Sequence, residues 1–190
     1  MAYSIENIKS QLVGGGARNA LFKASFSYPE GLGERSSQKL EFMCKASSGI
    51  PQSTISALDV DYMGRKVKVA GTRPAFPDWT LTIINDEDFL IRNDLEKWMN
   101  LINGHVDNQQ PVGLREYKTD GYIDQLSKDG SIIRRYTFKG IFPIDLGAIA
   151  LGWDQDTIQE FDVTFSIDWW EVSGNTSNID FPKGDNGSGA

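Results

Sequence analysis

The sequence predicts a mainly β protein: an antiparallel β-sandwich or half-barrel subunit with one packed α-helix. Several short segments alternate apolar and polar side chains, and glycine-containing turns separate them. Only one long segment has the apolar spacing of a helix. With 190 residues, the chain has the size of one compact domain. We therefore expect a single β domain with its helix packed on the sheet.

The N-terminal segment predicts a short helix. Ile5, Ile8 and Leu12 fall on one stripe of a helix. The glycines at positions 14–16 end this helix and are expected to act as a flexible joint. Residues 1–16 are therefore expected to form a short arm ahead of the β domain.

After the N-terminal arm, apolar side chains recur at every second position, and this spacing predicts strands. Residues 22–28 and residues 40–44 each place apolar side chains at alternate positions, as half-buried strands do. Residues 55–62 and 65–70 flank a turn at Gly64 and predict a hairpin with a thin apolar face on each arm. Because an isolated hairpin is marginally stable in water, the domain or a neighbouring subunit is expected to bury this one.

The second half of the chain predicts one helix among further strands. Residues 79–84 alternate as a strand does, and residues 89–103 place apolar side chains on one helical stripe. Residues 121–126 and 131–139 predict a second hairpin. The clearest strand covers residues 161–169, where an unbroken apolar row faces an unbroken polar row. One face of that strand is expected to be buried and the other to meet water.

The chain is expected to divide into a domain, residues 1–172, and a C-terminal tail, residues 173–190. The tail is rich in glycine, asparagine and serine. It has too little apolar surface to offset the entropy lost when a segment is ordered. The tail is therefore expected to be flexible.

The residue types that most side-chain chemistry needs are scarce. With one cysteine, Cys44, and one histidine, His105, the chain can form neither an intramolecular disulfide nor a multi-thiolate zinc site. Cys44 lies in an apolar row that is typical of a buried, inert thiol, and no serine has the surroundings of a nucleophile. The sequence predicts no enzyme, no metal and no cofactor. It also predicts no secretory signal and no membrane anchor, so we expect synthesis in a cytoplasm.

Charge is distributed unevenly along the chain. The net charge of −7 comes from residues 154–190, which hold eight acidic side chains and one lysine. The segment that carries Arg65, Lys66, Lys68 and Arg73 contains no acid. Such separation is what electrostatic complementarity between copies of one protein requires, and ordinary solvated surface is the alternative interpretation. The acidic excess argues against binding to nucleic acid, which depends on clustered cations.

Several segments resemble the tail tube proteins of contractile-tailed, myovirus-type bacteriophages. The resemblance is carried by residues 65–71, 78–87, the helix ending at Trp98, and residues 116–118, 139–143, 161–165 and 168–171. It extends from about Leu21 to Glu171. The chain departs from the family pattern at both ends, with a glycine triplet near its start and a longer tail after Glu171.

The resemblance implies a structural virion protein without catalytic activity. Such subunits assemble into stacked hexameric rings whose inner sheets join into one continuous β-barrel. The stacked rings form the inner tail tube, through which the genome is ejected inside a contractile sheath. The implied partners are copies of the chain itself, the sheath protein, the baseplate tube initiator, the tape measure protein and the tail terminator. DNA is expected to pass without specific binding, and the expected location is the virion tail after assembly in the host cytoplasm.

Other functions stay open from the sequence. One is a tube or ring protein of a related contractile injection system, such as type VI secretion or an extracellular injection device. Another is a baseplate tube initiator. A more distant alternative is an oligonucleotide-binding β-barrel module.

The resemblance also implies two sets of functional residues. The family hairpin contributes to contacts between stacked subunits, so the expected inter-subunit residues are Asp59, Asp61, Arg65, Lys66, Lys68 and Arg73. An acidic lumen is suggested as well, because exposed cations would retard a DNA duplex. The candidate lumen-facing acids are Glu160, Asp162 and Asp168, and the sequence leaves open whether that face points inward or outward.

Overall fold

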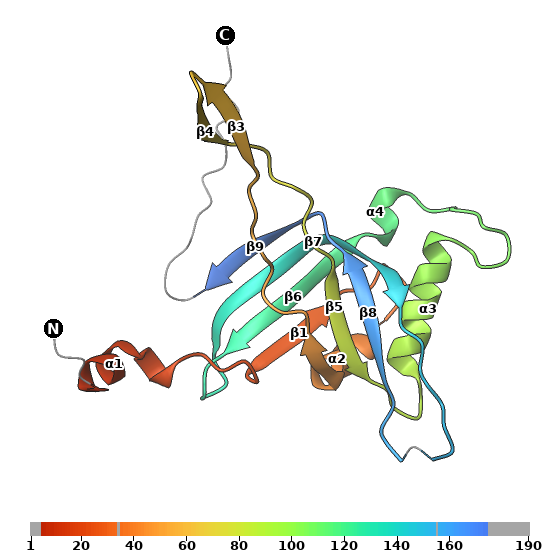
Figure 1. Ribbon diagram of the computed structural model, residues 1–190. Helices are drawn as coiled ribbons and strands as arrows, with labels where there is room; N and C mark the ends of the chain where they lie inside the picture. Colours follow the sequence, from red (N-terminus) through yellow and green to blue (C-terminus); the bar gives the residue numbers. More distant parts are fainter. Residues whose placement is uncertain (1–4, 34, 155, 175–190) are drawn as a thin grey trace, which may run out of the picture.

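Antiparallel strands dominate the computed structural model, which describes residues 5–33, 35–154 and 156–174 (Figure 1). The elements in chain order are α1 (Ile5–Gln11), the short helical turn η1 (Val13–Gly15), β1 (Phe22–Phe26), α2 (Ser36–Met43), β2 (Cys44–Ser47), β3 (Ala57–Tyr62), β4 (Arg65–Ala70), β5 (Trp79–Ile84), α3 (Leu90–Ile102), α4 (Leu114–Tyr117), β6 (Thr119–Leu126), β7 (Ile132–Leu146), β8 (Glu160–Ser166) and β9 (Trp169–Gly174).

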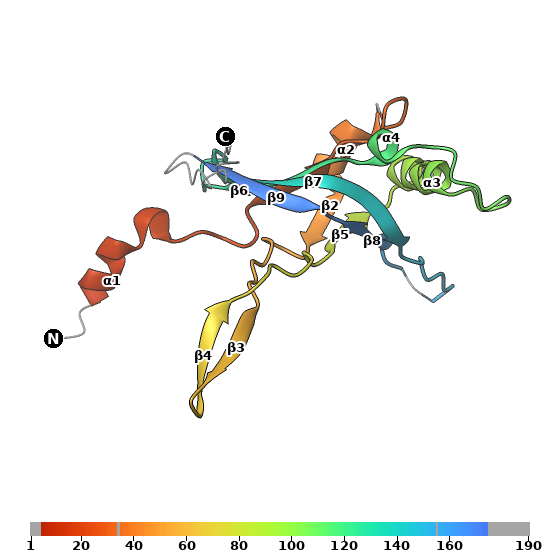
Figure 2. The ribbon, with the colours of Figure 1, turned by 90° about the horizontal axis from the view of Figure 1, so that it is seen from above.

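The long strand β7 organises the main sheet. The strand order is β1-β6-β7-β8-β5-β2, and β9 also pairs with β7. The first half of β7 lies between β6 and β9, whereas its second half pairs with β8. Gly140 has a φ of 67°, which glycine adopts without steric cost, and Figure 2 shows β7 arching between the two halves. The sheet therefore curves into a half-barrel, as the sequence predicts.

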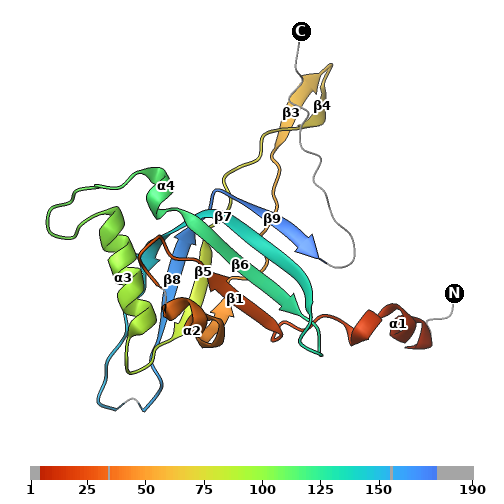
Figure 3. The same cartoon turned by 180° about the vertical axis from the view of Figure 1, so that it is seen from behind.

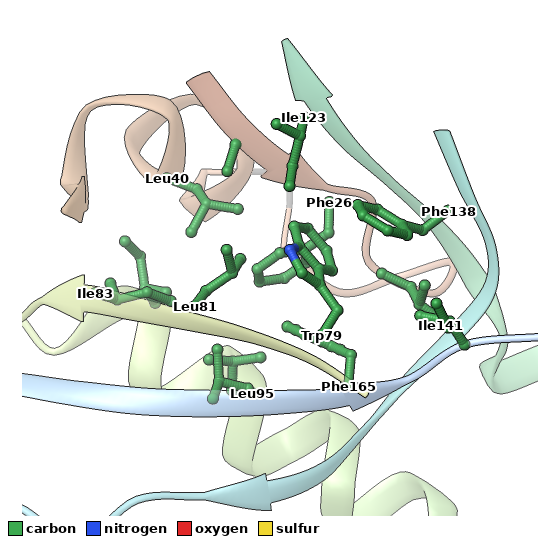
Figure 4. Close-up of a cluster of buried hydrophobic side chains, with 14 of the residues drawn as sticks. Phe26, Leu40, Trp79, Leu81, Ile83, Leu95, Ile123, Phe138, Ile141 and Phe165 are labelled. Carbon is green, nitrogen blue, oxygen red and sulfur yellow. The ribbon is translucent and has the colours of Figure 1, made fainter. Parts of the chain in front are cut away.

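The core lies inside this curved sheet. The ring of Phe165 on β8 is centred 4.8 Å from that of Phe26, 5.6 Å from that of Trp79 and 5.9 Å from that of Trp98. Trp79 also stacks on Phe138 of β7, with ring centroids 4.5 Å apart. Figure 4 shows Phe26, Trp79, Phe138 and Phe165 converging from separate elements. One aromatic cluster therefore ties β1, β5, β7, β8 and α3 together.

The predicted long helix is confirmed as α3. Its buried stripe consists of Ile91, Leu95 and Trp98, together with Asp94. The indole Nε1 of Trp98 donates a hydrogen bond to the carbonyl oxygen of Tyr117 at 2.9 Å. Figure 3 shows α3 running along one side of the sheet, where it covers the open side of the core.

The prediction of a strand over residues 40–44 is wrong for most of its length. Ser36–Met43 form α2, and the strand β2 begins only at Cys44. Leu40 and Ser36, one helical turn apart, are both buried, while Phe42 is 79% exposed. The hydroxyl of Ser36 donates to Asp94 Oδ2 of α3 at 2.7 Å. Packing against α3 thus selects a helix where the local alternation favours a strand.

The predicted strand over residues 161–169 is two strands. β8 ends at Ser166, and the chain then crosses to the first half of β7, where β9 begins at Trp169. Ile167 is still buried, but Trp169 is half exposed and does not continue the buried row. The break occurs because β7 bends at Gly140, so one straight strand cannot pair with both of its halves.

The structure tests the prediction for the N-terminal end of the chain but only part of the prediction for the C-terminal end. The N-terminal helix is confirmed as α1, which projects from the body in Figures 1 and 2. β9 continues past residue 172 to Gly174, with Ser173 opposite Arg135. Residues 175–190 lie outside the described residues, so their flexibility stays a prediction.

Candidate functional site

The hairpin of β3 and β4 is separate from the main sheet. It forms a two-stranded sheet of its own, and every residue of both strands is exposed. Figure 2 shows it projecting away from the body on two connecting segments. At its tip, Met63 and Gly64 have φ values of 45° and 80°, the left-handed turn that was predicted for Gly64. The described body does not bury this hairpin, which leaves a neighbouring subunit as the expected source of burial.

One face of the hairpin carries its charges in opposed pairs. Asp59 lies opposite Lys68, and Asp61 lies opposite Lys66. Oppositely charged side chains directly across two strands attract each other. Residues 65–73 contain no acid, but in the folded hairpin two acids of β3 lie opposite the two lysines of this segment. This face is close to neutral rather than basic.

The two arginines of the predicted set lie apart from this charged face. Arg65 is opposite Tyr62, at the end of the hairpin near the turn. Arg73 lies beyond β4, where its Nη1 donates to Ser53 Oγ at 2.7 Å and its guanidinium lies over the ring of Phe76. Arg73 therefore anchors the base of the hairpin.

The opposite face of the hairpin is apolar. Leu58 lies opposite Val69, and Val60 lies opposite Val67. These four side chains are between 49% and 57% exposed, and Tyr62 extends the same face. A contiguous exposed apolar patch of this kind is typical of a protein interaction site. The thin apolar face of each arm, visible in the sequence, becomes one surface when the arms pair.

The outer face of β5 and β8 is lined with hydroxyl and carboxylate groups. Thr80 and Thr164 share a hydrogen bond of 3.2 Å between their Oγ1 atoms. Next to them, Thr82 Oγ1 donates to Asp162 Oδ1 at 2.6 Å. Asp162 is exposed, and it forms no ion pair with any residue that the structure describes. This surface, called the β5–β8 polar face below, has an unneutralised acid at its centre.

The three candidate lumen acids do not share one environment. Glu160 also lies on β8, where Lys45 Nζ donates to its two carboxylate oxygens at 2.6 and 2.8 Å. Asp168 lies in the crossing between β8 and β9 and accepts hydrogen bonds of 2.8 and 2.7 Å from Lys118. The structure therefore places Glu160 and Asp162 on one strand face and gives Asp168 a separate role at the crossing.

A second polar face, which the sequence interpretation missed, covers β6 and the first half of β7. Arg135 donates from Nε and Nη2 to the two oxygens of Asp124, both at 2.6 Å. Lys139 donates to Asp120 Oδ2 at 2.5 Å. These hydrogen bonds raise the pKa of Arg135 and of Lys139. The sequence signal is weak: Asp124 lies on one arm of the predicted hairpin and Asp120 just before it, and the two cations lie on the other arm. Both of these acids are neutralised across the strands, whereas Asp162 on the β5–β8 polar face is not.

The side chains considered for catalysis or metal binding do not lie together in the structure. His105 is exposed just after α3, and its backbone N–H donates to Asn100 Oδ1 at 3.1 Å. Burial raises the pKa of the Cys44 thiol to about 11, which keeps it protonated at neutral pH. In the described ranges no group of three or more His, Cys, Asp or Glu side chains has the arrangement to hold a metal ion. Those ranges also contain no helix with the length and apolar character needed to cross a membrane.

Comparison with known proteins then decides the family. The family model described as phage tail tube protein matches residues 17–173. The chain belongs to the phage tail tube protein family. This membership confirms the resemblance stated from the sequence, and it makes the chain a structural component of a virion tail.

Similar proteins include the tail tube protein gp19 of Enterobacteria phage T4, which is 34% identical over 157 residues, or 82% of this chain and 91% of the relative. The gp19 protein of Enterobacteria phage T6 is 33% identical over the same shares. The tail tube protein of Serratia phage KSP90 is 22% identical over 73% of this chain and 77% of the relative. All three relatives carry the name of tail tube protein.

Solved structures support the fold of this tail tube family member. A chain from the PVC sheath–tube complex of an extracellular contractile injection system, in its extended state, superimposes with a TM-score of 0.63. It is 16% identical and covers 92% of this chain and 100% of that chain. A chain of the anti-feeding prophage baseplate also gives 0.63, at 10% identity over 85% of this chain and 97% of that chain. At these identities the likeness shows the fold, which confirms the mainly antiparallel β class.

Proposed function

We propose that this chain assembles with copies of itself into stacked hexameric rings that form the inner tube of a contractile phage tail. The genome passes through this tube during ejection, and the chain acts by assembly rather than by catalysis. The observation that carries the proposal is the hairpin of β3 and β4, whose residues are all exposed and whose apolar face is contiguous. In a family of tube proteins, such a surface is one that assembly covers.

The hairpin is proposed to contact a subunit of the adjacent ring. Its apolar face is buried there, which supplies the driving force for stacking. The charged side chains of the hairpin lie at the edge of this contact and define its register. They are Asp59, Asp61, Arg65, Lys66 and Lys68, with Arg73 holding the base of the hairpin.

The free edges of the main sheet are proposed to pair between subunits of one ring. Within the described parts of the chain, β1, β2 and β9 each pair with a single neighbouring strand. An open strand edge presents unpaired backbone donors and acceptors, which a neighbouring strand satisfies. Pairing around a hexamer would join the sheets into a continuous inner barrel.

The β5–β8 polar face is proposed to line the lumen. A DNA duplex carries one negative charge per ~1.7 Å, so a wall of hydroxyl and carboxylate groups offers it no adhesive contact. Asp162 contributes an unneutralised charge, and Glu160 neutralises the nearby cation Lys45. Asp168 is paired with Lys118 and is proposed to contribute less to the wall.

Further partners are proposed from the family and from the printed names of similar structures. They are the sheath protein, the baseplate tube initiator, the tape measure protein and the tail terminator. One fold relative is part of a sheath–tube complex, and another is a tube-terminating cap. No cofactor is proposed.

Electron microscopy of the purified protein at high concentration tests the proposed function. We expect long tubes of uniform diameter. Isolated rings without tubes would instead favour a ring protein of a related injection system. Molecules that stay monomeric would overturn the proposal, and monomers that shift a DNA probe at physiological salt would favour a nucleic-acid-binding module.

The lumen assignment makes a separate prediction. Replacing Asp162 by lysine is expected to preserve tubes but to slow DNA release from virions severalfold, because each ring would then present cations to the duplex. The matched control is Glu30→Lys, the same charge change at an exposed position between β1 and α2. Rates of DNA release in vitro provide the measurement. Equal rates for Asp162→Lys and wild type would remove the β5–β8 polar face from the lumen.

A further inference from the structure

The helix α1 presents an apolar face that the described part of its own chain does not cover. Ile5, Ile8 and Leu12 are 73%, 63% and 51% exposed. No residue of α1 is buried, and Figures 1, 2 and 3 all show the helix away from the body. A helix of seven residues is too short to be stable in water without packing. The surface that packs on α1 is therefore not among the residues that the structure describes.

The connection to the body suits an arm that docks elsewhere. Gly14, Gly15 and Gly16 have φ values of 63°, 77° and 84°, a left-handed conformation that glycine adopts without steric cost. The match to the family begins at residue 17, directly after these glycines. α1 thus precedes the part of the chain that the family model matches, and a glycine hinge joins the two.

A groove with both apolar and charged lining residues lies at the other end of the molecule. The second half of α3 and the end of β7 line a hollow of about 780 Å³, which adjoins a second one of about 520 Å³. Both are lined by Met99 and His105, so they form one continuous groove, called the α3–β7 groove below. Its apolar lining includes Met99, Val106 and Ile144. The charged side chains of Glu96, Lys97 and Asp145 line the larger hollow as well. Figures 1, 2 and 3 place α3 on the opposite side of the body from α1.

The helix α1 and the α3–β7 groove also carry side chains of opposite charge. Lys9 flanks the apolar stripe of α1, and Asp145 lies at the rim of the groove. Both side chains are exposed, and neither forms an ion pair within residues 5–33, 35–154 and 156–174. A helix that docks with its stripe in the groove can bring these two charges together.

A projecting element at one end and a receiving groove at the other is the geometry of head-to-tail contact, which forms a ring when the rotation between copies closes. We propose that α1 of one copy docks its Ile5, Ile8 and Leu12 face into the α3–β7 groove of the neighbouring copy in the same ring. This inference rests on the proposed assembly into rings. In this arrangement the N-terminal arm joins adjacent subunits of a ring.

Cysteine cross-linking tests the contact in assembled tubes. Two chains, one with Ile8→Cys and the other with Ile144→Cys, are mixed in a Cys44→Ser background and assembled before mild oxidation. We expect disulfide-linked dimers from the mixture and none from either chain alone. The matched control replaces Ile8→Cys with Ser10→Cys, which lies on the opposite face of α1 and is expected to cross-link at least fivefold less. A chain carrying both Ile8→Cys and Ile144→Cys is expected to give covalent hexamers.

The outcomes separate this inference from the proposed function. Tubes that form without dimers from Ile8→Cys and Ile144→Cys overturn the docking of α1 and leave the tube function intact. A failure to form rings or tubes overturns both. Lys9→Glu is expected to lower the dimer yield, and adding Asp145→Lys to the partner chain is expected to restore it. Equal yields in all three cases would also overturn the proposed orientation of α1.

Discussion

Replacing Val60 by aspartate together with Val67 by lysine is expected to abolish tube formation while the body stays folded. The two residues lie directly opposite each other on the apolar face of the hairpin, about half exposed. Because the new charges attract across the strands, the hairpin itself is expected to persist. Burying them against a neighbouring subunit would remove them from water, which is costly without good hydrogen-bonding partners. Stacking should therefore fail.

The measurement combines electron microscopy with circular dichroism and thermal unfolding. Tubes should be absent, while the spectrum and the unfolding of the body should match those of the wild-type monomer. The matched control replaces Val60 and Val67 by isoleucine, which keeps the same face apolar and adds no charge. We expect this control to form tubes. If the variant with Val60→Asp and Val67→Lys also forms tubes, burial of the apolar face does not drive the contact.

Replacing Phe165 by alanine is expected to destabilise the domain by ~3 to 5 kcal/mol. Phe165 is fully buried, and its ring contacts those of Phe26, Trp79 and Trp98. The change removes buried apolar surface and leaves a cavity that surrounding aromatic side chains fill only in part. Urea unfolding of the monomer should show a much lower midpoint with little change in slope.

The matched control is Phe42→Ala, the same substitution at an exposed position of α2. It is expected to change stability by less than about 0.5 kcal/mol, as surface substitutions usually do. The Phe42→Ala variant also tests whether residues 36–43 are helical, because a strand over residues 40–44 would bury Phe42. A large loss of stability in Phe42→Ala would contradict the helical assignment of α2.

Much of the fold follows from patterns that are local in the sequence. The stripe of Ile91, Leu95 and Trp98 predicts α3, and alternation predicts β5 and both hairpins. The family is also carried by contiguous segments, so the resemblance from Leu21 to Glu171 agrees with the match to residues 17–173. These features were accessible because each depends on neighbours within a few residues.

Other features depend on contacts between distant segments. α2 forms where alternation favours a strand, because Ser36 and Leu40 are buried beside α3 and β1. The row of residues 161–169 divides because β7 bends at Gly140. The charge of the hairpin face also depends on contacts between separate segments. It is close to neutral because Asp59 and Asp61 face the lysines of the other arm.

The sequence alone determined which side chains require burial, which segments turn, and to which family the chain is similar. Only the tertiary structure decided which surfaces remain uncovered: the apolar face of the hairpin, the β5–β8 polar face, α1 and the α3–β7 groove. The physical reason is that the spacing of apolar side chains shows only which side of each segment avoids water. Which surfaces meet, and which charges neutralise each other, depends on strand pairing and helix packing between residues far apart in the chain.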